Sequence, residues 1–146
     1  MNDGHRFAAD VAAWKHEEKM ARILVAEDEE ALRTLVARAL KGAGHDVITA
    51  ADGGAALDCL TREEGRFDLL LTDIKMPVMD GIAVALAAAR DYPDIVILLM
   101  TGYADQRERA LNLDALIHDV VSKPFTLAEI KTAVADALAV KAARAG

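Results

Sequence analysis

Short apolar runs alternate with longer segments of helical periodicity along most of this chain. Each run is four to six residues long and is rich in Val, Ile and Leu, which is typical of buried strands. The runs cover residues 22–26, 47–50, 67–72, 95–100 and 119–122. The segments with helical spacing or helix-capping residues cover residues 29–43, 52–60, 81–90, 105–113 and 126–140.

Strand and helix therefore alternate five times. Strands that are apolar on both faces belong in a parallel sheet that is covered by helices on each side. We predict a doubly wound α/β domain, with a five-stranded parallel sheet and helices on both faces. Sheets of this kind carry their functional sites outside the carboxyl ends of the strands.

The predicted domain covers residues 21–140 of the 146-residue chain. Residues 1–20 are expected to be an N-terminal extension: a disordered segment, a short helix with Trp14 on its apolar stripe, or sequence upstream of a true start at Met20. Residues 141–146 are expected to be a C-terminal tail. Because so little follows the last predicted helix, we expect the output to be a binding event rather than a second domain.

The formal net charge of −7 gives no general attraction to nucleic acid or to anionic membranes. No apolar run approaches the length of a membrane span, and residues 1–20 lack the apolar middle of a signal peptide. Cys59 is the single cysteine, so an internal disulfide is excluded. Together these features predict a cytoplasmic protein with neither nucleic acid nor membrane as a partner.

Charged and hydroxyl side chains stand at the ends of four predicted strands. Glu27 and Asp28 follow the first strand, Asp73 the third, Thr101 the fourth and Lys123 the fifth. Neighbouring carboxylates repel one another unless a cation lies between them, and an oxygen-only ligand set suits Mg²⁺. Each residue taken singly has a structural explanation, such as a helix N-terminus or a surface lysine. Gathered at one edge, they predict a functional site.

These groups suit phosphoryl transfer, which needs mainly alignment and charge neutralisation. Asp73 can act as the nucleophile and form an acyl phosphate. Lys123 and a magnesium ion would hold the phosphoryl oxygens, and the hydroxyl of Thr101 would donate a hydrogen bond to one of them.

The sequence resembles the receiver domains of bacterial two-component response regulators. The resemblance extends from Ala21 to about Leu138, and it is carried by four motifs in order: residues 23–29 (ILVAEDE), 71–81 (LTDIKMPVMDG), 100–102 (MTG) and 122–125 (SKPF). It implies a flavodoxin-like (βα)5 receiver fold. It also implies a signalling switch that catalyses only its own phosphorylation and dephosphorylation.

The resemblance assigns a role to each site residue. Asp73 would receive the phosphoryl group from a histidine kinase or a histidine phosphotransfer protein. Asp28, Asp73 and the backbone carbonyl of Lys75 would bind Mg²⁺ directly, and Glu27 would act through a water. The peptide bond before Pro124 would be cis.

Residues 20–24 and 115–125 look most like the CpdR group of alphaproteobacterial cell-cycle regulators, which are single-domain receivers in phosphorelays. This finer resemblance implies a phosphorylation-controlled adaptor that delivers substrates to the ClpXP protease. The partners would then be ClpXP or its substrates.

The chain departs from the common receiver pattern at two positions. Glu27 replaces the usual aspartate, and its extra methylene leaves room for a water. Val120 stands where many receivers carry an aromatic residue that moves inward on phosphorylation, so another readout is expected. Lys75 and Tyr103 are large enough to screen the site from attacking water.

Two other functions use the same residues. A hydrolase with an aspartyl-phosphate intermediate usually places its nucleophile in an Asp-x-Asp motif after the first strand, which residues 27–29 do not form. A pseudo-receiver that binds partners without phosphorylation is disfavoured because the four residues that the chemistry needs are all present: Asp28, Asp73, Thr101 and Lys123.

Overall fold

The computed structural model describes residues 21–102 and 104–145. The N-terminal extension expected at residues 1–20 and the water-screening role of Tyr103 lie outside the described residues.

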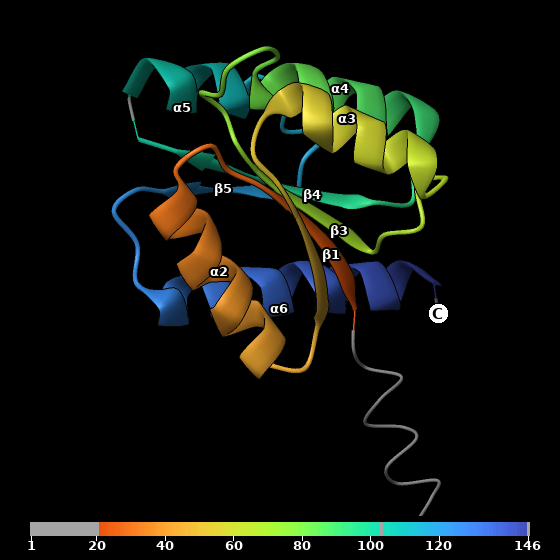
Figure 1. Ribbon diagram of the computed structural model, residues 1–146. Coiled ribbons are helices and arrows are strands. Elements are labelled where there is room, and N and C mark those ends of the chain that lie inside the picture. The colour runs from red at the N-terminus through yellow and green to blue at the C-terminus, as the bar shows by residue number, and fades with distance from the viewer. Residues whose placement is uncertain (1–20, 103, 146) are drawn as a thin grey trace, which may run out of the picture.

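Five parallel strands form one sheet in the order β2-β1-β3-β4-β5, as Figure 1 shows. Helices α2 and α6 cover one face of this sheet, and α3, α4 and α5 cover the other. The predicted doubly wound fold is confirmed. The elements are β1 (Arg22–Ala26), α2 (Glu30–Gly42), β2 (Asp46–Ala50), α3 (Gly53–Arg62), β3 (Leu69–Asp73), α4 (Gly81–Asp91), β4 (Val96–Thr101), α5 (Ala104–Leu111), β5 (Asp119–Ser122) and α6 (Leu127–Ala145).

The central strands explain why the apolar runs are nearly continuous. Every residue of β3 and β4 is buried, because both faces of the sheet are covered. Alternate strand residues enter two separate cores: Leu70 packs toward α3, α4 and α5, whereas Leu69 and Leu71 pack toward α2 and α6. None of the described helices combines the length and apolarity needed to cross a bilayer.

The capping residues identified in the sequence begin helices as expected. The Asp52 side chain accepts a hydrogen bond from the Ala55 N–H at 2.7 Å and begins α3. At the start of α6, the Thr126 N–H donates to Glu129 and the Glu129 N–H donates to the Thr126 hydroxyl, at 2.7 and 3.0 Å. This reciprocal pair is the predicted capping box.

Most predicted boundaries lie within two residues of those in the structure, and two of the differences have a clear physical reason. Strand β3 begins at Leu69 rather than Phe67, because the chain at Phe67 is still in the turn that brings its N–H to the Gly65 carbonyl at 2.7 Å. Helix α6 continues to Ala145 rather than ending near Val140. Its last turns are rich in Ala, Lys and Arg, which favour helix.

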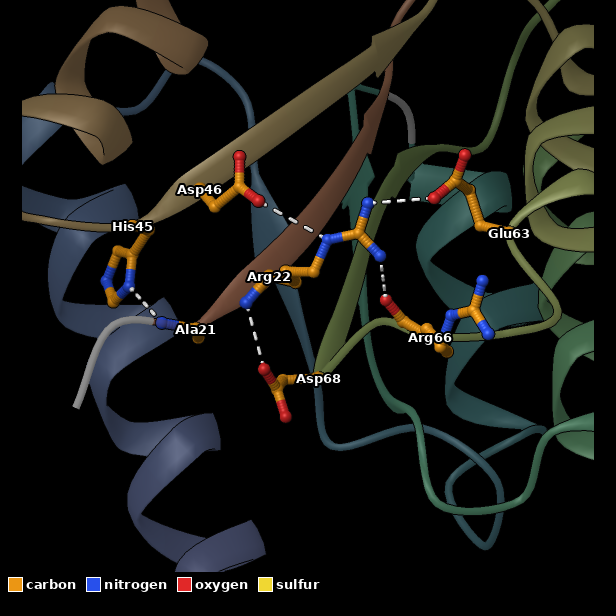
Figure 2. Close-up of polar contacts among 7 residues, drawn as sticks. All are labelled: Ala21, Arg22, His45, Asp46, Glu63, Arg66 and Asp68. Carbon is orange, nitrogen blue, oxygen red and sulfur yellow. Dashed lines mark hydrogen bonds and ion pairs between the residues drawn. The ribbon is translucent and has the colours of Figure 1, made fainter. Parts of the chain in front are cut away.

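Arg22 joins the amino-terminal ends of the strands, as Figure 2 shows. Its guanidinium pairs with Asp46 at 3.3 Å and with Glu63 at 2.9 Å, and it lies 4.8 Å from the centre of the Phe67 ring. Its backbone N–H donates to Asp68 at 2.8 Å. At this end of the sheet, the acids are therefore paired with Arg22 and hold neighbouring segments together.

Candidate active site

The carboxyl ends of β1, β3, β4 and β5 meet at one edge of the sheet. Glu27 and Asp28 follow β1, whereas Asp73 and Thr101 are the last residues of β3 and β4. Lys123 follows β5, and its Nζ lies 2.9 Å from Glu27 Oε1 and 3.1 Å from Asp73 Oδ2. The structure thus brings together the side chains that the sequence placed at separate strand ends.

The two acids paired with Lys123 are deeply buried. Glu27 is 1% exposed and Asp73 is 5% exposed, whereas Asp28 faces solvent. Glu27 is held by the Glu29 N–H, which donates to Oε2 at 3.0 Å, and Arg33 donates to the Glu27 backbone carbonyl at 2.9 Å. Both Glu27 oxygens therefore have protein partners, Oε1 in Lys123 and Oε2 in the Glu29 N–H.

Glycine at position 81 allows the chain after Asp73 to fold tightly. A Cβ on Gly81 would lie 1.9 Å from the Asp73 carbonyl oxygen, a distance that no side chain can adopt. The Gly81 N–H also donates to the Ile74 carbonyl at 2.7 Å. The loop that carries Lys75 is thereby held against the end of β3.

Burial dominates the electrostatics of the acids. It raises the pKa of Asp73, and the lowering effect of Lys123 only partly opposes it while the charge of Asp28 adds to it. Burial likewise raises the pKa of Glu27, against hydrogen bonds from the Glu29 N–H and Lys123. For Lys123, burial works to lower the pKa, but the hydrogen bond to Glu27 and the charge of Asp73 outweigh it, so the pKa is raised. Lys123 therefore stays charged throughout the physiological range.

The backbone at Lys123 is anchored beside the end of β4. The peptide bond between Lys123 and Pro124 is cis, as the resemblance implied. The Lys123 N–H donates to the Thr101 carbonyl at 2.7 Å. The lysine and the threonine are thus held next to each other on adjacent strands.

The hydroxyl of Thr101 has a partner that sequence reasoning missed. Thr101 is 3% exposed, and its Oγ1 donates to Gln106 Oε1 at 3.3 Å. Gln106 lies in the polar helix α5, where the sequence shows no motif around it. Only the folding of α5 over the end of β4 identifies it as part of the site.

An open cavity of about 540 Å³ lies over these groups and is large enough for a phosphoryl group with its solvent. Lys75 and Gln106 form part of its wall, and Asp73 and Lys123 are also exposed to it. Its lining residues are Glu27, Asp28, Glu29, Asp73, Lys75, Gly102, Gln106, Lys123 and Pro124.

The acids at this edge fit a hard cation. One carboxylate oxygen from each of Glu27, Asp28 and Asp73 lies within 4.8 Å of the other two. The donor set is oxygen only, and the raised pKa of Asp73 reflects the cost of burying its charge near Asp28. A divalent cation would offset that cost, and Mg²⁺ prefers such ligands.

Val120 is buried in the core beneath α5, with 6% of its surface exposed. The position that carries an aromatic residue in many receivers is therefore an ordinary packing position here. Because valine has no aromatic ring, Val120 cannot make the inward ring movement that the resemblance associates with this position.

Comparison with known proteins agrees with this geometry. The family profile of the response regulator receiver domain matches residues 23–135. The response regulator receiver protein CpdR of Brucella abortus (strain 2308) is 42% identical over 114 residues, which are 76% of this chain and 91% of that protein. The sensor kinase CckA of the same organism is 36% identical over 119 residues, which are 81% of this chain but 12% of the kinase.

A solved structure shows the same arrangement of elements. The crystal structure of the response regulator protein TrrA from Thermotoga maritima, in complex with Mg(2+)-BeF, superposes with a TM-score of 0.71 and 34% sequence identity. The match covers 81% of this chain and 99% of TrrA. On the family match, the relatives and the shared fold, this chain belongs to the response regulator receiver domain family.

Proposed function

We propose that this protein is a phosphorylation switch that accepts a phosphoryl group on Asp73 from a histidine kinase or a histidine phosphotransfer protein. The observation that carries the proposal is the pairing of Lys123 Nζ with both Asp73 and Glu27 beneath an open cavity. A buried acid beside a fixed cation, open to solvent on one side, is suited to receive an anionic group.

The transfer needs one bond to form and one to break. A carboxylate oxygen of Asp73 forms a bond to phosphorus while the bond from phosphorus to the donor's histidine nitrogen breaks, and the imidazole leaves with that electron pair. The Lys123 ammonium neutralises negative charge on the phosphoryl oxygens. The hydroxyl of Thr101 turns to donate a hydrogen bond to one of them.

Asp28, Asp73 and the backbone carbonyl of Lys75 are the proposed direct ligands of Mg²⁺, with Glu27 acting through a water. The ion would neutralise charge on the transferred group. Glu27 serves a second purpose, because its ion pair fixes the position of Lys123. The structure of the relative TrrA, which is a complex with Mg(2+)-BeF, supports the proposal that this fold binds Mg²⁺.

The proposed output is a binding event on the surface of the domain. The likeness to the CpdR protein, which this chain matches over nearly its whole length, supports a phosphorylation-controlled adaptor of the ClpXP protease in the cytoplasm. The test is retention of the protein on immobilised ClpX. We expect the phosphorylated and unphosphorylated forms to be retained to different extents. Equal retention of both forms, or none, contradicts the adaptor role.

The phosphorylation itself is tested with acetyl phosphate, Mg²⁺ and intact mass measurement. We expect one phosphoryl adduct on the wild-type protein and none on the Asp73→Asn variant. Asp58→Asn, which removes an exposed carboxylate from α3, is the matched control and should keep the adduct.

Other outcomes identify the alternatives. Continuous release of phosphate with no accumulated adduct indicates a hydrolase. No adduct under any condition indicates a pseudo-receiver. An adduct that persists in Asp73→Asn rules out Asp73 as the acceptor.

A further inference from the structure

Helix α5 makes polar contacts with several parts of the domain, and one of its residues, Gln106, lines the cavity. Among its side chains that the structure describes, those of residues 106–111, only Ala110 is buried. The polar contacts reach three different elements: Gln106 with Thr101 at the end of β4, Arg107 with Ser122 at the end of β5, and Arg109 with Asp80 at the start of α4.

The contact between Gln106 and Thr101 bears directly on the switch. The Thr101 hydroxyl carries one hydrogen, which it donates to Gln106 Oε1 at 3.3 Å. The same hydrogen cannot be donated at that moment to a phosphoryl oxygen on Asp73. Gln106, Asp73 and Lys123 all line the cavity, and the Lys123 N–H donates to the Thr101 carbonyl at 2.7 Å, so the proposed alternative acceptor lies in the same site.

We propose that Gln106 is a positioning residue that holds the Thr101 hydroxyl in the unphosphorylated state and thereby lowers the occupancy of the phosphorylated state. The inference rests on the proposed function, in which Thr101 donates to the phosphoryl group. A hydrogen bond that exists in only one of two states shifts the equilibrium toward that state. The usual net strength of one such bond corresponds to about two- to twelvefold in the equilibrium constant.

The same contact links the acceptor site to α5. When the Thr101 hydroxyl turns to the phosphoryl group, Gln106 loses that hydrogen bond, while the polar contacts of α5 through Arg107 and Arg109 remain. With Val120 in place of an aromatic residue, this exchange of hydrogen bonds offers a readout that needs no ring movement.

The test compares wild type with Gln106→Leu, which keeps the side-chain size but removes the acceptor, at equal acetyl phosphate and Mg²⁺ concentrations. We expect the ratio of phosphorylated to unphosphorylated protein to rise about two- to twelvefold. Glu108→Leu, an exposed position on the same helix, is the control and should leave the ratio unchanged. Gln106→Met is a second variant should the leucine variant fold poorly.

A double-mutant cycle separates positioning from a structural effect. In a Thr101→Val background, which lacks the hydroxyl, Gln106→Leu should cause no further change. A persisting change in that background, or a fall in phosphorylation, would show that Gln106 acts on the cavity itself and would overturn the proposal. If wild type is phosphorylated on Asp73 but Gln106→Leu matches it, only the positioning role fails. If wild type takes no phosphoryl group, the proposed function fails and the inference with it.

Discussion

At the scale of single residues, the site depends on acids that are buried at a cost. Asp73 and Glu27 have raised pKa values chiefly because burial disfavours their charged forms. Lys123 reduces this cost by pairing with both. In the proposed reaction, Asp73 must nevertheless be ionised to attack phosphorus. Burial, which favours its neutral form, therefore works against the reaction.

The raised pKa of Asp73 predicts how the rate of phosphorylation changes at low pH. Phosphorylation by acetyl phosphate should fall as the pH falls through the raised pKa of Asp73. Folding stability should change with pH in the opposite direction. Between the unfolded and the folded pKa of Asp73, the unfolded state has already lost the proton that the folded state keeps. The contribution of Asp73 to the free energy of unfolding therefore falls as the pH rises through this window. Initial phosphorylation rates and denaturant unfolding, measured over the same pH series, check both trends.

The Lys123→Met variant tests whether Lys123 sets the pH dependence of phosphorylation. Removing the cation should raise the pKa of Asp73 further and move the acid side of the profile to higher pH. A profile that stays in place would show that Lys123 does not set the ionisation of the acceptor.

Val78 shows strain at a single position. Its φ is +72° although its side chain is β-branched, and the side chain is 83% exposed. Val78→Gly should relieve the left-handed strain and lose little burial. We expect the free energy of unfolding to rise by about 0.5–1 kcal/mol, since the relief exceeds the entropic cost of glycine. Urea unfolding measures the difference. Val78→Ala retains a Cβ at positive φ and should gain less than the glycine variant.

At the scale of elements, the first turn of α3 packs against the loop that follows β3. A Cβ on Gly53 would lie 1.8 Å from the Met79 carbonyl oxygen, whereas one on Gly54 would lie 3.0 Å from Val78 Cγ1. The two adjacent glycines therefore have different roles. Gly53 permits a close backbone approach, and Gly54 faces a side chain that can move.

This difference predicts unequal effects of the same substitution. Gly53→Ala must displace backbone, so we expect it to destabilise the protein by more than about 2 kcal/mol. Gly54→Ala gains helix propensity, and its Cβ meets two side chains, the exposed Val78 at 3.0 Å and Asp52 Oδ1 at 3.3 Å, so its effect should stay within about 1 kcal/mol. Thermal unfolding of the two variants measures the contrast, and equal losses would mean that the Met79 contact is not the cause.

At the scale of the whole molecule, the two ends of the sheet differ in how their charges are arranged. At the amino-terminal end, Arg22 pairs with Asp46 and Glu63 on neighbouring elements (Figure 2). At the carboxyl end, Lys123 pairs with Glu27 and Asp73, and the carboxylate of Asp28 lies close to both acids. The first arrangement has one cation with two acids, whereas the second has one cation with three acids, and a divalent cation would offset that larger excess of negative charge.

Magnesium should therefore stabilise the folded protein. At a Mg²⁺ concentration of ten times the Kd, the free energy of unfolding should rise by about 1.4 kcal/mol. Chelation should reverse the gain, and Asp28→Asn should remove most of it, because Asp28 is a proposed direct ligand. Asp58→Asn should retain the full effect. Thermal unfolding with and without Mg²⁺ measures all three, and an equal shift in Asp28→Asn contradicts the ligand assignment.

The order of the elements and the chemistry at the strand ends were determined by the sequence alone. Apolar runs, helical spacing and capping residues act over a few positions, so the five strands, the caps at Asp52 and Thr126 and the placement of Asp73 at a strand end could be predicted. The end of α6 was predicted too early because the sequence there contains no local stop signal.

Only the tertiary structure decided how these groups meet. Lys123 and Glu27 are 96 residues apart, and their 2.9 Å contact exists because parallel strands end at one edge. Gln106 became part of the site because α5 folds over Thr101, and Gly53 is confined by a loop more than twenty residues away. Such contacts depend on distances between elements, which local sequence patterns do not encode. The place of Asp73 at a strand end could therefore be predicted from the sequence, whereas the distances to its neighbours and the energetic cost of its burial could not.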